Sequence, residues 1–204
     1  MDIKELAVPG AYEVTSTVHA DDRGAFLEWF RADAFNVATG HDFRLAQANV
    51  SVNRAGALRG LHFAQLPPGQ AKYVTCLSGA VFDVVVDIRV GSPTYGAWDA
   101  VRLDDESRRA VYVGEGLGHG FLALAEGTVV SYLCSAPYAP GREHDIDPFD
   151  PAIGIEWPST TRDDAPLEVL RSAKDLAAPS LEEVRRRGVL PDYDETRAFV
   201  AGLA

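Results

Sequence analysis

Short apolar runs, separated by single glycines and prolines, follow one another along most of the chain. The clearest run is VFDVVVDI at Val81–Ile88, in which successive side chains point to opposite faces of a strand. One face is entirely apolar, whereas the other carries the carboxylates of Asp83 and Asp87. This alternation predicts a β-strand with two chemically different faces.

The same kind of pattern predicts a mostly β protein. Further strands are expected over Gln47–Val52, Gln70–Leu77, Ala97–Leu103, Ala110–Val113, Gly120–Ala125 and Thr128–Ser135. Proline and glycine content predicts loops at Leu66–Gln70 and Gly91–Gly96. Many short strands in succession favour an antiparallel sandwich or a small barrel, and the jelly roll is the commonest such fold with a central ligand cavity.

Helical patterns are confined to two regions. Ser180 can cap the segment LEEVRRRG, which has acidic residues in its first turn and arginines in its last. A shorter helix is expected around Arg31–Ala38. No linker or repeat divides the chain, so we predict one domain over residues 1–204, with residues 180–204 as a helical C-terminal extension.

Composition narrows the class of protein. With 204 residues, 47% of them hydrophobic, the chain can bury one substantial core. A formal net charge of −11 repels a phosphate backbone and argues against a nucleic-acid partner. The chain has no apolar run of about 18 residues and no signal-peptide pattern, so we expect a cytoplasmic protein without membrane contact. Cys76 and Cys134 stand in apolar contexts and are expected to be buried thiols.

The segment LRGLHFAQLPPGQAK places Arg59, His62 and Lys72 close together in the chain. A hairpin around its Pro-Pro-Gly loop would bring His62 and Lys72 into contact. A histidine can accept a proton near neutral pH, and a lysine stays cationic and can stabilise a developing oxyanion. The pair therefore suits proton abstraction beside a carbonyl, although a hydrogen-bonded core histidine and a surface lysine would give the same pattern.

Three other segments contain candidate functional residues. His119 lies in GEGLGHGF, where glycines allow close approach, but glycine-rich turns are also common before strands. Tyr132 in VVSYLC could be a general acid inside a barrel, whereas most strand tyrosines only fill the core. In DRGAFLEWF, Arg23 could bind phosphate and Phe26 could stack on a base, with Glu28 nearby. An edge strand with a surface ion pair would look much the same.

A metal site is not expected. The five histidines form no HxH or HxxxH pattern, and Ala64, two residues after His62, cannot coordinate a metal ion. The chain also has no GxSxG, P-loop or GxGxxG motif, which argues against a serine hydrolase, an NTPase and a dinucleotide enzyme.

Several of these segments occur in an order that resembles a known family. The resemblance is to the nucleotide-sugar epimerases of the dTDP-4-dehydrorhamnose 3,5-epimerase family, over residues 3 to 180. It rests on DDRGAFLEWF, QANVSVNRAGALRGLHF, PPGQAKYVTCLSGAVFDVVVDIRVGSPTYGAW, GLGHGFLAL, SYLCSAPYAPGRE, IGIEWP and RSAKD. The tail after residue 180, together with REHDIDPFDPAIGIEWP, resembles the antibiotic-sugar epimerases of actinomycetes, several of which invert only one centre.

The resemblance implies both a fold and a reaction. The fold is a cupin-type jelly roll that forms homodimers, with substrate contacts contributed across the subunit interface. The reaction is epimerisation of dTDP-4-dehydro-6-deoxy-D-glucose at C3, at C5 or at both, through an enolate and without a cofactor. A ketone at C4 acidifies the hydrogens on C3 and C5, so one base and one acid on opposite faces can invert a centre.

The resemblance also implies a role for each site residue. His62 would abstract the proton, Asp175 would orient its imidazole, Lys72 would stabilise the enolate oxygen and Tyr132 would return a proton. The positions expected to contact the substrate are Arg23, Phe26, Glu28, Gln47, Asn49, Arg59, His119, Tyr138, Glu143 and Lys174.

Three alternatives remain at this point. They are a mono-epimerase acting at C3 or C5 alone, a non-catalytic nucleotide-sugar-binding cupin, and a metal-dependent cupin enzyme. The binding module is disfavoured because the base, the acid and Asp175 are all present, and the metal enzyme is disfavoured by the missing HxH. The pose of Tyr132 relative to C5 decides between one inversion and two.

Overall fold

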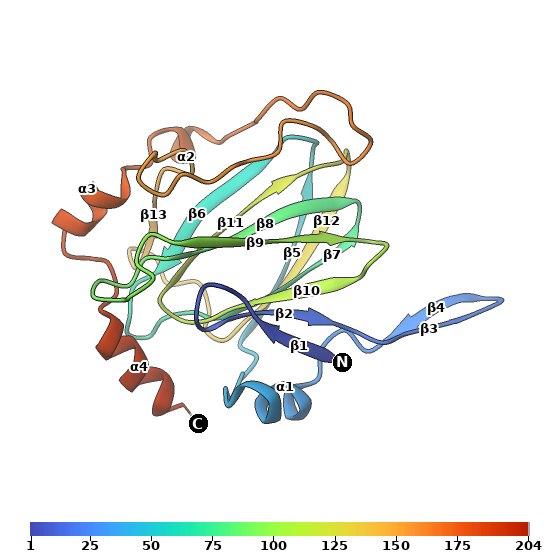
Figure 1. Ribbon diagram of the computed structural model, residues 1–204, viewed down its shortest axis with the longest axis horizontal. Helices are drawn as coiled ribbons and strands as arrows, with labels where there is room; N and C mark the ends of the chain where they lie inside the picture. The colour runs from blue at the N-terminus through green and yellow to red at the C-terminus, as the bar shows by residue number, and fades with distance from the viewer. Residues whose placement is uncertain (204) are drawn as a thin grey trace.

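Two antiparallel β-sheets stacked face to face make up most of the computed structural model, which describes residues 1–203 (Figure 1). The larger sheet contains, in spatial order, β1 (Asp2–Glu5), β2 (Ala11–Thr15), β10 (Arg109–Val113), β7 (Lys72–Ser78), β12 (Thr128–Cys134) and β5 (Gln47–Asn53). The smaller sheet contains β13 (Glu143–Asp145), β6 (Leu58–Ala64), β11 (Leu117–Ala123), β8 (Ala80–Asp87) and β9 (Trp98–Asp104). A separate hairpin of β3 (Val18–Asp21) and β4 (Gly24–Leu27) projects from the body of the molecule.

The pairing of the central strands is nested. β5 pairs with β12, β6 with β11, β7 with β10 and β8 with β9, and every pair is antiparallel. This is the pairing of a jelly roll, in which one long folded ribbon is wound into two sheets. Successive strands therefore lie in alternate sheets, except at the β8–β9 turn. The expected jelly-roll fold is confirmed.

This alternation shows that the hairpin expected between His62 and Lys72 is wrong. His62 lies on β6 in the smaller sheet, and Lys72 begins β7 in the larger sheet. The proline-rich loop between them carries the chain from one sheet to the other instead of reversing it within a sheet. The two side chains consequently belong to opposite walls of the sandwich.

Short helices cover the outside of the sandwich, as expected (Figure 1). They are α1 (Ala32–Thr39), α2 (Ala173–Leu176), α3 (Leu181–Arg186) and α4 (Tyr193–Ala201). Ser180 caps α3 through a capping box: its hydroxyl accepts from the Glu183 N–H, and the Glu183 carboxylate accepts from the Ser180 N–H. No helix in residues 1–203 is both long and apolar enough to cross a membrane.

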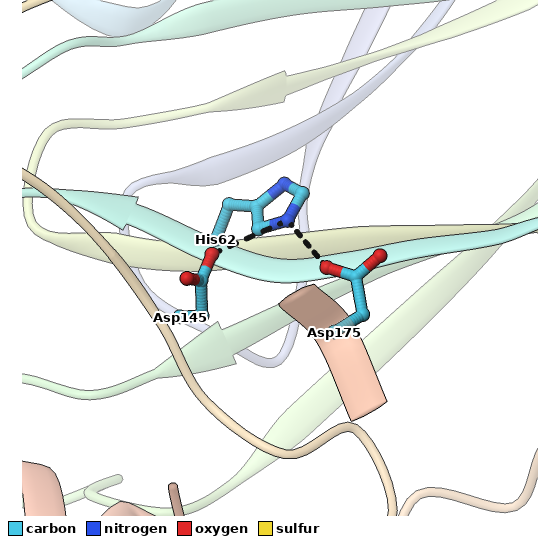
Figure 2. A group of neighbouring side chains, drawn as sticks. All are labelled: His62, Asp145 and Asp175. Atoms are coloured by element: carbon cyan, nitrogen blue, oxygen red, sulfur yellow. Dashed lines mark hydrogen bonds and ion pairs between the residues drawn. The ribbon is translucent and has the colours of Figure 1, made fainter. Parts of the chain in front are cut away.

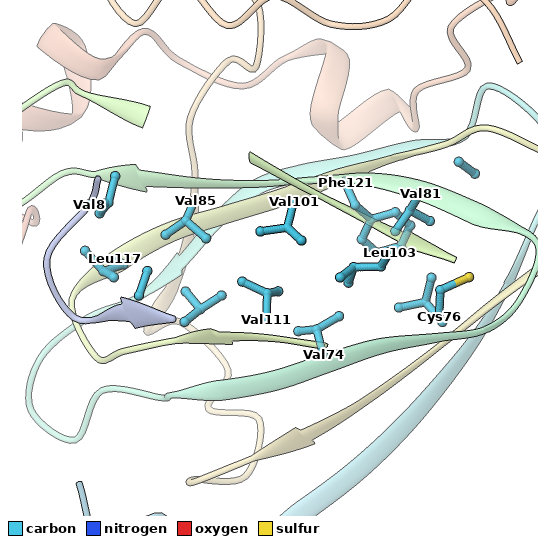
Figure 3. Packing of buried hydrophobic residues seen from close by; sticks show 14 residues of the cluster. Val8, Val74, Cys76, Val81, Val85, Val101, Leu103, Val111, Leu117 and Phe121 are labelled. Carbon is cyan, nitrogen blue, oxygen red and sulfur yellow. The ribbon is translucent and has the colours of Figure 1, made fainter. Parts of the chain in front are cut away.

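The main core lies between the two sheets (Figure 3). Val81 and Val85 of β8 meet side chains of the larger sheet there, such as Val74 and Val111. Burying each valine stabilises the fold by about 1.5–3 kcal/mol. Both Cys76 and Cys134 are buried free thiols, as expected.

The opposite, apolar face of β8 is also covered. Its Val84 and Val86 pack in a second cluster with Leu181 and Val184 of α3. Asp83 and Asp87 therefore point toward the interior between the sheets and need polar partners there.

Candidate active site

A small cavity lies between the two sheets and has a volume of about 150 Å³. It is lined by Ser51, Arg59, His62, Lys72, His119, Phe121 and Tyr132. Five of the residues expected to act on or bind a substrate therefore come together. Pockets that hold a complete small-molecule ligand usually measure about 300–1,000 Å³, so this cavity fits one ring of a larger molecule. A cleft of about 410 Å³ beside α4 contains none of the expected residues.

A β-bulge sets the positions of the residues on β6 and β11. The register between these strands shifts between His119 and Phe121, so His62 lies opposite His119 while Arg59 lies opposite Phe121. Gly60 adopts a φ of +118°, and a Cβ at this position would lie 2.7 Å from the Cα of Gly120. Glycine is therefore required at this close contact between β6 and β11.

His62 is held by carboxylates at one of its two ring nitrogens. Its Nε2 lies 3.1 Å from Oδ1 of Asp175 and 3.5 Å from Oδ1 of Asp145 (Figure 2). Within residues 1–203, Nδ1 has no hydrogen-bond partner. An Nε2–H that donates to a carboxylate leaves Nδ1 as the unprotonated nitrogen. His62 can therefore accept a proton at Nδ1.

Asp175 reaches His62 from α2, which lies 113 residues further along the chain. Ser172 caps this helix, and its hydroxyl donates to Oδ2 of Asp175 at 2.7 Å. Burial opposes ionisation of the carboxyl group, but hydrogen bonds from His62 and Ser172 outweigh it, and the pKa of Asp175 is lowered. The carboxylate is thus ionised and fixed in direction, so that it can orient the imidazole.

A second histidine–aspartate pair stands beside the first. Nε2 of His119 lies 2.9 Å and 3.0 Å from the two carboxylate oxygens of Asp83 on β8. Asp83 is completely buried and the side chain of His119 is 9% exposed. This pair explains why a carboxylate is tolerated on the inner face of β8.

Lys72 stands on the opposite wall, next to Cys134 in the β7–β12 ladder. Burial lowers the pKa of the Lys72 ammonium, while Cys134, Glu143 and Asp83 act in the opposite direction. Among residues 1–203, no carboxylate forms an ion pair with this ammonium. It is therefore available to stabilise an oxyanion inside the cavity.

Tyr132 lies on the same wall as Lys72, on β12 between Asn49 and Val74 in the neighbouring strands. Burial raises the pKa of the phenol, and Arg59 partly opposes this effect. The hydroxyl group consequently remains protonated at neutral pH and can donate a proton or a hydrogen bond.

Polar residues expected at the substrate continue from the cavity along β5 and β6. Gln47 and Asn49 share the inward face of β5 with Ser51, and Nε2 of Gln47 donates to Oδ1 of Asn49 at 2.9 Å. Nε of Arg59 donates to Oδ1 of Asn53 at 2.7 Å. These contacts hold the side chains in place beside the cavity.

Three further expected residues lie on the segments that follow β12. The backbone N–H of Tyr138 donates to Oε1 of Gln47 at 3.0 Å, and the side chain of Tyr138 is exposed. Glu143 lies on β13, opposite Ala64 of β6. Lys174 lies on α2 with a side chain that is 65% exposed, and its Nζ lies 2.9 Å from Oδ1 of Asp145.

The remaining expected residues do not reach this cavity within one chain. Arg23, Phe26 and Glu28 lie on or beside the projecting β3–β4 hairpin (Figure 1). Arg23 pairs with Asp21, and the Phe26 side chain is largely exposed.

His62, Asp145 and Asp175 offer ligand atoms within 4.8 Å of one another, the spacing of a metal site. Each carboxylate already has a partner, however: Asp175 contacts His62 and Ser172, and Asp145 contacts the Lys174 ammonium. The ammonium would repel a divalent cation. These contacts favour a proton-transfer group over a metal centre.

The arrangement suits acid–base chemistry at carbon beside a carbonyl group. One wall supplies an imidazole that a carboxylate orients, and the other supplies an ammonium and a protonated phenol. A base, an oxyanion partner and an acid are the three groups that enolate chemistry needs.

A family model described as dTDP-4-dehydrorhamnose 3,5-epimerase matches residues 5–183. The chain belongs to this family. It is 56% identical to the dTDP-4-dehydrorhamnose 3,5-epimerase of Mycobacterium tuberculosis strain CDC 1551, covering 100% of this chain and 98% of that relative. The solved structure of the rmlC epimerase of Mycobacterium tuberculosis has a TM-score of 0.95 and 54% identity, with 100% of both chains covered. ChmJ, a 3'-monoepimerase from Streptomyces bikiniensis solved in complex with dTDP-quinovose, has a TM-score of 0.91 and 46% identity, with 98% of both covered.

The epimerase contains site residues that carry no motif in the sequence. Ser51, Phe121 and Asp145 each lie two residues after an expected site residue on the same strand, after Asn49, His119 and Glu143 respectively. Side chains two positions apart on a strand lie on the same face. Examining the second residue after each expected site residue would therefore have identified all three. The sequence identifies Asp83 only as a carboxylate on a predicted strand and does not indicate that His119 is its partner.

Proposed function

We propose that the epimerase inverts both C3 and C5 of dTDP-4-dehydro-6-deoxy-D-glucose in deoxysugar biosynthesis. The observation that carries this proposal is one cavity with a carboxylate-held imidazole on one wall and an ammonium and a phenol on the other. Family membership supports the reaction class, and the names of the relatives supply the nucleotide sugar.

Proton abstraction begins the proposed mechanism. Nδ1 of His62 takes the hydrogen from C3, the C–H electron pair forms a C3–C4 double bond, and the C4 oxygen becomes an enolate. Lys72 stabilises this oxyanion, an effect that is large in a cavity from which water is mostly excluded. Asp175 stabilises the imidazolium that forms.

Reprotonation from the opposite wall completes the inversion. The enolate carbon takes a proton from the Tyr132 hydroxyl, and the C4 ketone reforms. The His62 imidazolium then releases its proton to solvent, and the Tyr132 phenolate takes up a proton from solvent. The same sequence at C5 inverts the second centre. The substrate's own ketone accepts and returns the electron pair, so the reaction is redox-neutral and needs no cofactor.

The nucleotide lies outside the cavity in this proposal, because about 150 Å³ accommodates only the sugar ring. Arg59 and His119 would contact the sugar and the diphosphate. Gln47, Asn49, Tyr138 and Glu143 would form the nucleotide pocket beyond them.

The proposed enzyme is a homodimer. The outward face of the edge strand β5 exposes Val50 and Val52, with exposed fractions of 64% and 69%. The β3–β4 hairpin extends away from its own body and exposes Phe26. An edge strand with exposed valines is a surface that proteins normally cover, and an arm of this kind can bring Arg23, Phe26 and Glu28 to a partner's cavity.

The cytoplasm is the proposed location of this enzyme. A nucleotide diphosphate sugar is charged and does not cross a lipid bilayer unaided. Two buried free cysteines are compatible with a reducing compartment.

Proton NMR of dTDP-4-dehydro-6-deoxy-D-glucose with the enzyme in D2O tests the reaction. Exchange of hydrogen for deuterium at both C3 and C5 is expected. Exchange at C3 or C5 alone would show a mono-epimerase and contradict the double inversion, and exchange at neither would contradict the proposed function.

Two conservative variants test the roles of individual residues. Tyr132→Phe should slow product formation while leaving exchange at the first centre measurable. Its matched control is Tyr95→Phe, because within residues 1–203 the buried Tyr95 hydroxyl has no hydrogen-bond partner. Equal effects of the two variants would contradict the role of Tyr132.

Light scattering of the purified protein tests the dimer. Val50→Asp should produce a monomer and reduce activity, because it places a charge in the proposed interface. Val37→Asp is the matched control, since Val37 is an 89% exposed valine on α1. A monomeric wild-type protein would contradict the proposed assembly.

A further inference from the structure

One oxygen atom connects the proposed base to a lysine that lies outside the cavity. Oδ1 of Asp145 lies 3.5 Å from Nε2 of His62 (Figure 2). The same oxygen lies 2.9 Å from Nζ of Lys174. His62 therefore has two carboxylate neighbours at the same nitrogen, and only one of these carboxylates carries a cation of its own.

The fold fixes both members of this ion pair. Asp145 ends the short strand β13 and lies directly opposite His62 in the β13–β6 ladder, so the two side chains share a face. Lys174 precedes Asp175 on α2, so neighbouring residues of one short helix contact Asp145 and His62. The side chain of Asp145 is only 16% exposed, which keeps its charge from being screened by water.

The charges around the imidazole are nearly balanced as a result. Two ionised carboxylates beside Nε2 would favour the imidazolium over the neutral imidazole. Lys174 offsets the charge of Asp145, so that of the two carboxylates at Nε2 only Asp175 has no cation beside it. Hydrogen bonding to Asp145 raises the pKa of the Lys174 ammonium, so this cation persists throughout the working pH range.

We propose that the Lys174–Asp145 ion pair positions His62 electrostatically and sets the pH at which its imidazole can accept a proton from the substrate. Asp145 and Lys174 act through His62 and are positioning residues. This inference rests on the proposed function, in which His62 is the base.

Other groups also face His62 and must stay constant in any test. They are Arg59 on its own strand, His119 on β11, Glu143 on β13, Asp175 on α2, Lys72 on β7 and Tyr132 on β12. Variants of Asp145 and Lys174 leave every one of them in place.

NMR titration of the His62 C2–H resonance, assigned with His62→Asn, measures protonation directly and requires no turnover. Asp145→Asn removes a negative charge and should move the titration midpoint about one pH unit lower. Lys174→Met removes a positive charge and should move it about half a unit higher, a smaller effect because Lys174 is 65% exposed. The acid limb of kcat/KM should move in the same directions.

The double variant Asp145→Asn/Lys174→Met restores the charge balance and should return the midpoint close to that of the wild type. Arg185→Met is the matched control, because it breaks an exposed ion pair with Glu182 on α3 without approaching His62. It should leave the midpoint unchanged.

The results separate this inference from the proposed function. Unchanged midpoints in both single variants, or shifts of the same sign, would overturn the charge-balance role even if turnover is normal. Higher KM in Lys174→Met without a shifted midpoint would instead make Lys174 a direct substrate ligand and also overturn the inference. Shifted midpoints in an enzyme that exchanges no substrate hydrogen would leave the electrostatic coupling established and refute the proposed reaction.

Discussion

The two histidine–aspartate pairs of the cavity use the same residue types in different surroundings. His62 is 32% exposed and meets one oxygen of Asp175, whose other oxygen is held by Ser172. His119 is 9% exposed and meets both oxygens of an aspartate that is completely buried. The first pair stands where a proton can enter and leave, and the second is enclosed by the core.

This difference shows how burial separates two uses of one interaction. A partly exposed imidazole on a single hydrogen bond can change its protonation state during a reaction, because water and substrate reach it. An enclosed imidazole between two oxygens is better suited to hold one orientation. We therefore interpret His62–Asp175 as the proton-transfer pair and His119–Asp83 as a fixed part of the cavity wall.

The largest expected difference between the pairs concerns reaction rate. His62→Asn should lower kcat/KM for exchange at C3 by about a thousandfold or more, the usual contribution of a general base. His119→Asn should lower it by about a hundredfold, the effect of losing one fixed hydrogen-bond donor beside the substrate. His41→Asn, outside the cavity, should have little effect. Equal losses at His62 and His119 would contradict the division of roles.

A second difference is expected in stability. Asp83→Ala should lower the free energy of unfolding by about 3 kcal/mol, because it leaves a buried histidine without its partner. Asp175→Ala should cost about 1 kcal/mol, because water can replace the lost contact at the partly exposed His62. Urea denaturation of both variants measures this. The comparison fails if Asp175→Ala is the more destabilising change.

The smallest expected effect is a change in the free energy of unfolding at acidic pH, which depends on the ionisation of Asp175. Its pKa is lowered in the folded protein, so its contribution is fully present above the unfolded value of about 3.9 and is lost as the pH falls through the lower folded value. Ser172→Ala removes one hydrogen bond that lowers this pKa. It should therefore destabilise the protein by about 1 kcal/mol at pH 7 and by less at pH 3. The exposed Ser159→Ala is the control, and an equal cost of Ser172→Ala at both pH values would contradict this assignment.

The sequence alone predicts the β-rich fold well. The alternation in VFDVVVDI identifies β8 within one residue at each end, and Ser180 correctly marks the start of α3. Local periodicity succeeds here because each element is amphipathic or capped by its own residues. β11 is less well predicted: it begins at Leu117 rather than Gly120, because glycines within the strand resemble a turn.

Local periodicity in the sequence does not predict which residues of the two sheets come into contact. His62 and Lys72 are close in the sequence, which predicts a hairpin between them. The jelly roll instead places them on facing walls of the sandwich. The partnership of His62 with Asp175 spans 113 residues, and it was expected only through family resemblance. Asp145 and Asp83 follow from strand register, which local periodicity does not determine.

The alternation of β5 restricts how this strand can change during evolution. Gln47, Asn49 and Ser51 face inward, whereas Val50 and Val52 face outward on the same seven residues. Adding or deleting a single residue would exchange the two sets, turning valines toward the interior of the sandwich and amides away from it. Relatives that retain the activity should therefore vary in β5 by substitution, and gaps in an alignment of the family should fall in the loops on either side of this strand.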